Sequence, residues 1–245
     1  MRQRRPIFDQ LRDALPVARW GFYELLVVFV VVLAAAAAIG VQGLPWAAAA
    51  VVPLALAGAA AWFYRDPRRS VPDDPAVYLA PADGTVVAID SLDDNADEEE
   101  KGHLDGCGFF TGPAVRVGIF LSVFDVHINR CPHAGRVAKV EYRRGEHRDA
   151  RSPESVQRNE SNWIGFEDER GGRFAVRQVS GAVARRIACD LAPGQPVRAG
   201  EKFGMIKLGS RTELTLPAGA EVLCRVGDKV RGGQTVLARV AGGPL

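Results

Sequence analysis

The sequence predicts a mainly β (α+β) protein in which an N-terminal transmembrane helical hairpin precedes a β-rich domain. Two observations predict this fold. Two apolar runs near the start of the chain each reach the ~20 residues that a helix needs to cross a bilayer. From residue 70 onwards, Gly and Pro separate short runs of Val, Ile, Leu and Ala, a spacing typical of short strands. We therefore expect two parts, residues 1–69 and residues 70–245.

The N-terminal segment before the first apolar run is basic. Residues 1–19 carry five arginines against two aspartates, and Ile7, Phe8, Leu11 and Leu15 recur at roughly helical spacing. This pattern fits a helix lying on anionic lipid, and it fits a solvated lead-in to the membrane equally well.

The two apolar runs cover residues 21–39, with Glu24 as the only charged residue, and residues 44–64, with none. A link of only four residues, 40–43, joins them, so we expect a helical hairpin that spans the bilayer or dips into one leaflet. A hairpin buried inside a soluble protein is the competing interpretation. A signal peptide is not expected, because the first run is long and a second follows at once.

Basic residues flank this hairpin on its open side. Arg19 precedes it, and Arg65, Arg68 and Arg69 follow it. By the positive-inside rule, both ends face the cytoplasm. The sequence therefore predicts a protein of the cell (inner) membrane whose β-rich domain is cytoplasmic.

The composition excludes some classes of protein. The formal net charge of +2 gives no global field for binding nucleic acid. The cysteines are far apart and form no C-x-x-C pair, which favours free thiols in a reducing compartment. They are Cys107, Cys131, Cys189 and Cys224.

Five segments read as strands, and two polar stretches between them, residues 91–105 and 145–162, read as long loops. The expected strands are Val86–Ile89, Val115–Val123, Gly135–Tyr142, Arg173–Val179 and Ala218–Val226. Two segments, 80–89 and 217–236, resemble the half-motifs of biotinyl/lipoyl-like sandwiches. No lysine lies in the Met-Lys context that carries biotin or lipoate.

The Gly209-Ser210 bond has the chemistry for self-cleavage. Ser210 Oγ can attack the carbonyl carbon of Gly209, which has no Cβ and tolerates a strained turn. The amide becomes an ester, loss of the Ser210 α-proton expels it, and the dehydroalanine hydrolyses to ammonia and a pyruvoyl group. An ordinary surface turn is the competing interpretation of Gly-Ser.

Self-cleavage needs a base, because the pKa of a serine hydroxyl is far too high at neutral pH. His103 and His147 lie in the polar loops, where solvation is expected. His127 follows the apolar run 115–123, so it can point into a site or be a satisfied core histidine. His127, Cys131 and His133 match no common zinc spacing, so no metal is expected.

Segments around these residues resemble the phosphatidylserine decarboxylase proenzymes, which are pyruvoyl-dependent membrane enzymes. Residues 203–211, Phe-Gly-Met-Ile-Lys-Leu-Gly-Ser-Arg, resemble the family's processing site, with Arg211 where many members have Thr. Phe124-Asp-Val-His127, with Pro132 after it, resembles the segment that bears the catalytic histidine. Arg130 stands where some members have a second histidine.

The resemblance implies further site residues. Asp83, in Pro81-Ala-Asp-Gly84, corresponds to the carboxylate that orients the histidine, with Asp125 as its rival. Residues 159–162, Asn-Glu-Ser-Asn, resemble another family segment. Arg185 and Arg186 lie in a Gly–Ala–Arg–Arg run and either hold the lipid phosphate or form a solvated, ion-paired face.

The implied function is decarboxylation of phosphatidylserine to phosphatidylethanolamine. A covalent pyruvoyl group made from Ser210 would form a Schiff base with the substrate amine and act as the electron sink. The mature protein would be two chains, and a homo-oligomer remains open. Alternatives are a decarboxylase of a related serine lipid, a pyruvoyl enzyme acting on a soluble amino acid, and a non-enzymatic membrane-anchored lipoyl-like adaptor.

Overall fold

The structure is a computed structural model, and it describes residues 16–40, 51–92, 109–110, 112–150, 152, 157–182, 186–207 and 209–240. The chain forms two compact units, residues 1–68 and residues 69–245. Each unit is described by itself.

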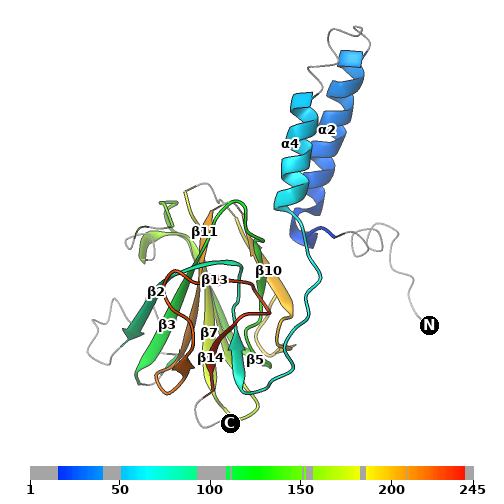
Figure 1. Cartoon of the computed structure of the whole chain (residues 1–245). Helices are drawn as coiled ribbons and strands as arrows, with labels where there is room; N and C mark the ends of the chain where they lie inside the picture. The colour runs from blue at the N-terminus through cyan, green and yellow to red at the C-terminus, as the bar shows by residue number, and fades with distance from the viewer. Residues whose placement is uncertain are drawn as a thin grey trace, which may run out of the picture. The chain divides into compact units, whose positions relative to one another are not determined.

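The first unit contains a short 3-10 helix, η1 (Arg19–Gly21), followed by α2 (Phe22–Gly40) and α4 (Val51–Phe63). The two α-helices lie side by side (Figure 1). Among the described residues, one helix is long and apolar enough to cross a membrane, Arg19–Ala38. The second predicted span is described as a helix of 13 residues, and its first part, residues 44–50, lies outside the described residues.

The side chains of this unit distinguish a membrane hairpin from a hairpin buried in a soluble core. Many of its large apolar side chains are exposed, which is unfavourable in water and favourable in lipid. They include Leu26, Val27, Phe29, Val30, Val31, Leu33, Val52, Leu54 and Leu56. The described part of the hairpin therefore has the surface of a lipid-facing element.

The second unit is built from antiparallel strands, as the sequence predicts. Eight strands form one sheet in the order β13-β2-β3-β11-β7-β6-β5-β9, and two three-stranded sheets have the orders β1-β14-β12 and β4-β10-β8 (Figure 1). The strands are β1 (Val77–Leu79), β2 (Gly84–Leu92), β3 (Ala114–Leu121), β4 (Ile128–Arg130), β5 (Gly135–Arg143), β6 (Ser161–Glu167), β7 (Arg173–Val179), β8 (Ile187–Cys189), β9 (Pro196–Val197), β10 (Lys202–Ile206), β11 (Ser210–Pro217), β12 (Glu221–Val222), β13 (Lys229–Val230) and β14 (Val236–Arg239).

Four of the five predicted strands correspond to β2, β3, β5 and β7. The fifth, Ala218–Val226, was predicted too long, because only Glu221–Val222 is a strand. Turns bound it on both sides. The Ala220 amide donates to the Pro217 carbonyl, and the Arg225 amide donates to the Asp228 carboxylate. The strands β2 and β13 pair, Val230 with Gly84, but the likeness to biotinyl/lipoyl half-motifs is not confirmed.

The hydrophobic core joins the three sheets. It is rich in β-branched and aromatic side chains, which pack well on a pleated surface. Phe166 and Phe174 stack at its centre with ring centroids 4.9 Å apart, and Tyr78 of β1 packs against Phe174. Residues from the small sheets, including Phe203 and Leu237, complete it. The small sheets are therefore fixed to the large one by burial of apolar surface.

Candidate active site

One end of the large sheet gathers almost every segment that the sequence singles out. The register pairs Ser210 with Leu121, and Val179 with both Arg211 and Ser161. The loops that leave these strand ends therefore share one edge. Their described residues are 80–84, 122–127, 144–150, 152, 157–160, 180–182, 186, 207 and 209. We call this edge the loop end of the sheet.

Ser210 begins β11 at the loop end and is completely buried. Among the described residues its Oγ has no hydrogen-bond partner, which is costly for a buried hydroxyl and therefore unusual. Gly209 has φ = +62°, a left-handed conformation that favours glycine. Gly181 approaches so closely that a Cβ there would lie 2.0 Å from the Gly209 carbonyl oxygen.

His127 is also completely buried. Its Nδ1 lies 2.9 Å from the backbone carbonyl oxygen of Asp125. Because a carbonyl oxygen only accepts, Nδ1 carries the proton, and the lone pair of the neutral ring is on Nε2. The ring therefore has the tautomer that a general base needs.

A buried polar network joins β4, which directly follows His127, to β11, which begins at Ser210. The Asn129 side-chain amide donates to Thr212 Oγ1 at 3.0 Å, and the Gln178 amide donates to Asn129 Oδ1 at 2.9 Å. Asn129 lies in β4, two residues after His127, and Thr212 lies in β11, two residues after Ser210. The hydrogen bond therefore holds the strand that follows the histidine against the strand that begins with the serine.

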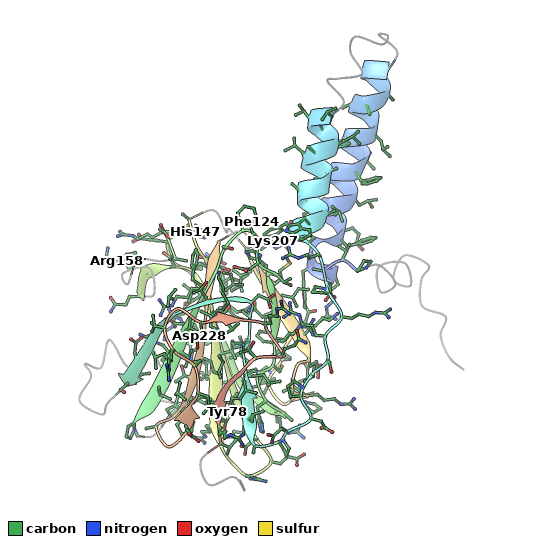
Figure 2. The ribbon with its side chains drawn as sticks, in the orientation of Figure 1. Tyr78, Phe124, His147, Arg158, Lys207 and Asp228 are labelled. Atoms are coloured by element: carbon green, nitrogen blue, oxygen red, sulfur yellow. The ribbon has the colours of Figure 1, made fainter. Side chains whose placement is uncertain are left out.

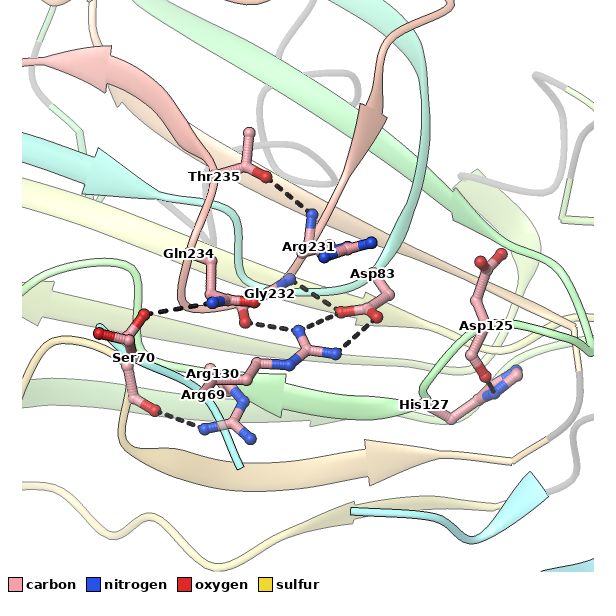
Figure 3. A network of polar contacts seen from close by, with 11 residues as sticks. Arg69, Ser70, Asp83, Asp125, His127, Arg130, Arg231, Gly232, Gln234 and Thr235 are labelled. Carbon is pink, nitrogen blue, oxygen red and sulfur yellow. Dashed lines mark hydrogen bonds and ion pairs between the residues drawn. The ribbon is translucent and has the colours of Figure 1, made fainter. Parts of the chain in front are cut away.

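Asp83 lies at the same end, in a charged network (Figure 3). Arg69 donates to both of its carboxylate oxygens, at 2.5 and 2.7 Å, and the Gly232 amide donates to Oδ1 at 2.8 Å. Arg69 also donates to the Gly232 carbonyl oxygen at 2.6 Å. Within the described residues, the carboxylate of Asp83 thus contacts Arg69 and Gly232. The sequence had indicated only that Arg69 flanks the hairpin.

Asp125, the alternative to Asp83, and His133 have structural contacts of their own. The Asp125 carboxylate accepts hydrogen bonds from the Ser122 amide and hydroxyl, at 2.8 and 2.7 Å, so it closes the turn after β3. His133 is buried, with Nδ1 2.7 Å from the Ala134 carbonyl oxygen and Nε2 2.9 Å from that of Pro75. His133 therefore fastens the segment before β1.

His147 is a residue whose surroundings the sequence did not reveal. Its Nδ1 lies 3.2 Å from Ser180 Oγ, and its Nε2 lies 3.6 Å from the Glu160 carboxylate. The Tyr142 hydroxyl donates to Glu160 at 2.8 Å, and this hydrogen bond raises the pKa of Tyr142. Figure 2 labels His147 at the loop end, beside Phe124 and Lys207. His147 is exposed, as expected for a residue of a polar loop, and it also has these two polar neighbours.

A buried ionic cluster lies on β3, β7 and β11 next to the site. Glu213 accepts from Arg211 at 2.9 Å and lies 3.7 Å from Arg177 and 3.9 Å from Arg116. Burial lowers the pKa of Arg177, which the nearby Glu213 carboxylate opposes. Strand alternation puts Arg211 and Glu213 on the face opposite Ser210. The cluster is therefore part of the framework of β11 and does not touch the serine.

The remaining predicted site residues are only partly described. Arg186 is exposed, and its carbonyl oxygen accepts from the Lys207 amide. Arg185 and His103 lie outside the described residues. No group of three or more His, Cys, Asp and Glu that could hold a metal occurs in the described part of the chain. Its three cysteines, Cys131, Cys189 and Cys224, are free.

Comparison with known proteins gives consistent matches. The family model described as phosphatidylserine decarboxylase matches residues 56–238. A phosphatidylserine decarboxylase proenzyme of Rhodopirellula baltica is 42% identical over 93% of this chain and 90% of its own length. A protein of the same name from Desulfotalea psychrophila is 38% identical over 73% of this chain and 78% of its own length. Another, from Pelodictyon phaeoclathratiforme, is 37% identical over 90% of this chain and 98% of its own length.

Proposed function

The chain belongs to the phosphatidylserine decarboxylase family, and from this premise we propose how its own residues decarboxylate phosphatidylserine to phosphatidylethanolamine. The proposal assigns the cofactor to Ser210, which becomes a pyruvoyl group when the chain cuts itself before this residue. The observation that carries it is the buried Ser210 hydroxyl without a hydrogen-bond partner among the described residues, directly after a glycine with positive φ.

The residues around the bond fit this cleavage. Ser210 Oγ attacks the Gly209 carbonyl carbon while its proton passes to His127 Nε2, and the amide becomes an ester. Removal of the Ser210 α-proton expels the Gly209 carboxylate. Water then hydrolyses the dehydroalanine, which releases ammonia and leaves a ketone at the start of the new chain. Burial of Ser210 excludes competing water from the first step.

His127 is proposed as the base of the cleavage and as a proton donor in the later decarboxylation. The Asp125 carbonyl supports this role, because it fixes the ring tautomer. Asp83 is proposed as the carboxylate that stabilises the imidazolium. Arg69 and the Gly232 amide hold this carboxylate in a fixed position.

The pyruvoyl ketone, once formed, supplies an electron sink for the bond between the substrate Cα and its carboxyl group. The protein binds and orients the lipid. Arg186, which is exposed at the loop end, is proposed with Arg185 to contact the phosphate, because a guanidinium matches phosphate oxygens. His127 then delivers a proton at the carbon from which CO2 has left.

The location follows from the first unit. The apolar helix α2 is long enough to anchor the chain in a membrane. We propose that it does so in the cell (inner) membrane, with the second unit in the cytoplasm, because the arginines flank the open side of the hairpin. A lipid headgroup is then within reach of a membrane-anchored enzyme.

The test is the covalent state of the purified protein. The mature form should be residues 1–209 and a chain of 36 residues (245 − 209) that lacks a free amine, so N-terminal sequencing of the small chain should give no signal. Ser210→Ala should remain one chain. Cyanoborohydride during turnover should fix the lipid amine on the 36-residue chain. An active protein of 245 uncut residues would refute the assignment.

A further inference from the structure

Two exposed apolar side chains stand at the loop end of the sheet. Val123 and Phe124 follow β3 directly and are 44% and 74% exposed. Phe124 is the most exposed large apolar side chain in the described part of the chain. Its counterparts in the core, Phe166 and Phe174, are fully buried. An exposed aromatic ring next to a candidate site indicates a surface that is covered during function.

The turn that carries these side chains is fixed. The Asp125 carboxylate accepts from the Ser122 amide and hydroxyl, and the Asp125 amide donates to the Ser122 carbonyl at 2.9 Å. Val123 and Phe124 are the two residues between the joined ends of this turn. The exposure of Val123 and Phe124 is therefore built into the local structure.

Basic side chains lie at the same end of the sheet as this apolar tip. Arg144 follows β5, and Arg158 precedes β6. Arg186 precedes β8 and Lys207 follows β10, and the Lys207 amide donates to the Arg186 carbonyl oxygen. The three arginines are exposed, and Figure 2 labels Phe124, Arg158 and Lys207 around the loop end.

Exposed carboxylates in the same loops offset little of this charge. They are Glu146, which is paired with Arg148, and Asp149. The other acidic groups among the described residues of this end are less exposed: Asp83 pairs with Arg69, Asp125 closes its turn, and Glu160 is buried against Tyr142. The rim is therefore cationic on balance.

We propose that this tip and rim dock on the surface of a bilayer that contains anionic lipid. Phe124 and Val123 enter the boundary between headgroups and acyl chains, and Arg144, Arg158, Arg186 and Lys207 lie against the charged headgroups. The inference rests on the proposed function, because docking brings the loop end, where His127 and Ser210 lie, to the plane of the lipid headgroups. It assigns a second membrane contact to the β unit itself, separate from the hairpin.

Depth-dependent quenching tests the contact without reference to catalysis. Phe124→Trp and the matched control Leu223→Trp, at a position that is 45% exposed after β12, are made in the full chain. Each is reconstituted in phosphatidylcholine/phosphatidylglycerol vesicles with and without acyl-brominated lipid. The tryptophan added at 124 should be quenched and the one at 223 should not. Removal of phosphatidylglycerol should weaken the quenching at 124. Equal quenching at both positions, or none at 124, would overturn the proposal in favour of a protein partner.

Kinetics separate docking from the chemistry. Phe124→Ser should raise KM for bilayer phosphatidylserine about tenfold, because the variant lacks the aromatic surface that docking buries in the bilayer. Its kcat on monomeric dihexanoyl phosphatidylserine should not change, and Leu223→Ser should match the parent on both substrates. An equal loss on both substrates would overturn docking. A parent protein that acts on neither substrate would refute the proposed function, and the quenching result would still decide the docking.

Discussion

Gly181→Ala should stop self-cleavage without unfolding the protein. A Cβ at residue 181 would lie 2.0 Å from the Gly209 carbonyl oxygen, whereas ordinary van der Waals contact begins at 3.4 Å. The two groups must therefore separate by about 1.4 Å (from 2.0 to 3.4 Å). Both are backbone, so no flexible side chain absorbs the change, and the carbonyl that Ser210 attacks is displaced. A misplacement of about 1 Å costs about 10²-fold in rate.

The assay is the time course of cleavage on a denaturing gel after a pulse of synthesis. Gly135→Ala is the matched control, because its Cβ would lie 2.5 Å from the Glu167 carbonyl oxygen. That contact is also with backbone, and it lies where β5 begins and β6 ends, at the opposite end of the sheet. The control should lose stability yet still be cut. Cleavage of folded Gly181→Ala at the parent rate would show that the Gly181 contact does not position the scissile carbonyl.

Three further predictions follow from the contacts of single side chains. The His127→Ala variant should cleave itself at least about 10²-fold more slowly, because the serine loses its base. His133→Gln should still be cut, since His133 contacts only the carbonyls of Pro75 and Ala134 among the described residues. The reverse pattern on a gel would reassign the base. Glu213→Gln should destabilise the protein by about 3–5 kcal/mol, because it leaves three arginines without their shared buried carboxylate. Glu167→Gln, in an exposed pair with Arg173, should cost less than about 1 kcal/mol. Similar urea midpoints for the two variants would contradict the role of the cluster. Burial raises the pKa of the Cys131 and Cys224 thiols above its ordinary value, which disfavours the reactive thiolate. Iodoacetamide at pH 8 should therefore modify both only after unfolding, as measured by mass spectrometry. Rapid alkylation of the folded protein would show that the thiols are accessible.

The sequence was sufficient for the features that depend on local pattern. Short apolar runs separated by Gly and Pro predicted β2, β3, β5 and β7. The Gly209-Ser210 bond and His127 were identified through segments with a family resemblance. The same local patterns overestimated the strand after residue 217, where two short-range turns compete with pairing.

What the sequence did not reveal depends on residues far apart in the chain. Arg69 and Asp83 are close enough in sequence for an ion pair between them to be considered. Gly232, which donates to the same carboxylate, lies 149 positions beyond Asp83. The approach of Gly181 to Gly209 and the pairing of His147 with Glu160 and Ser180 likewise arise from strand register. A single sequence carries no signal of register between distant strands, so these contacts required the fold.

The position of β11 decides what becomes of the protein after the cut. Ser210–Pro217 is paired along its length with β3 and along most of it with β7, and β13 and β14 of the same 36-residue piece pair with β2 and β1. Breaking the bond before Ser210 therefore frees one end of a strand that stays held on both edges. In the proposed mechanism, the pyruvoyl electrophile is made once, in place, and cannot be exchanged as a dissociable coenzyme is. A molecule whose ketone is lost to a side reaction has no second serine to convert. In the proposed mechanism, the working life of each molecule is then set by how rarely such a side reaction occurs, for example protonation at a carbon of the pyruvoyl group in place of the substrate carbon. Replacement of an inactivated molecule requires synthesis of a new chain.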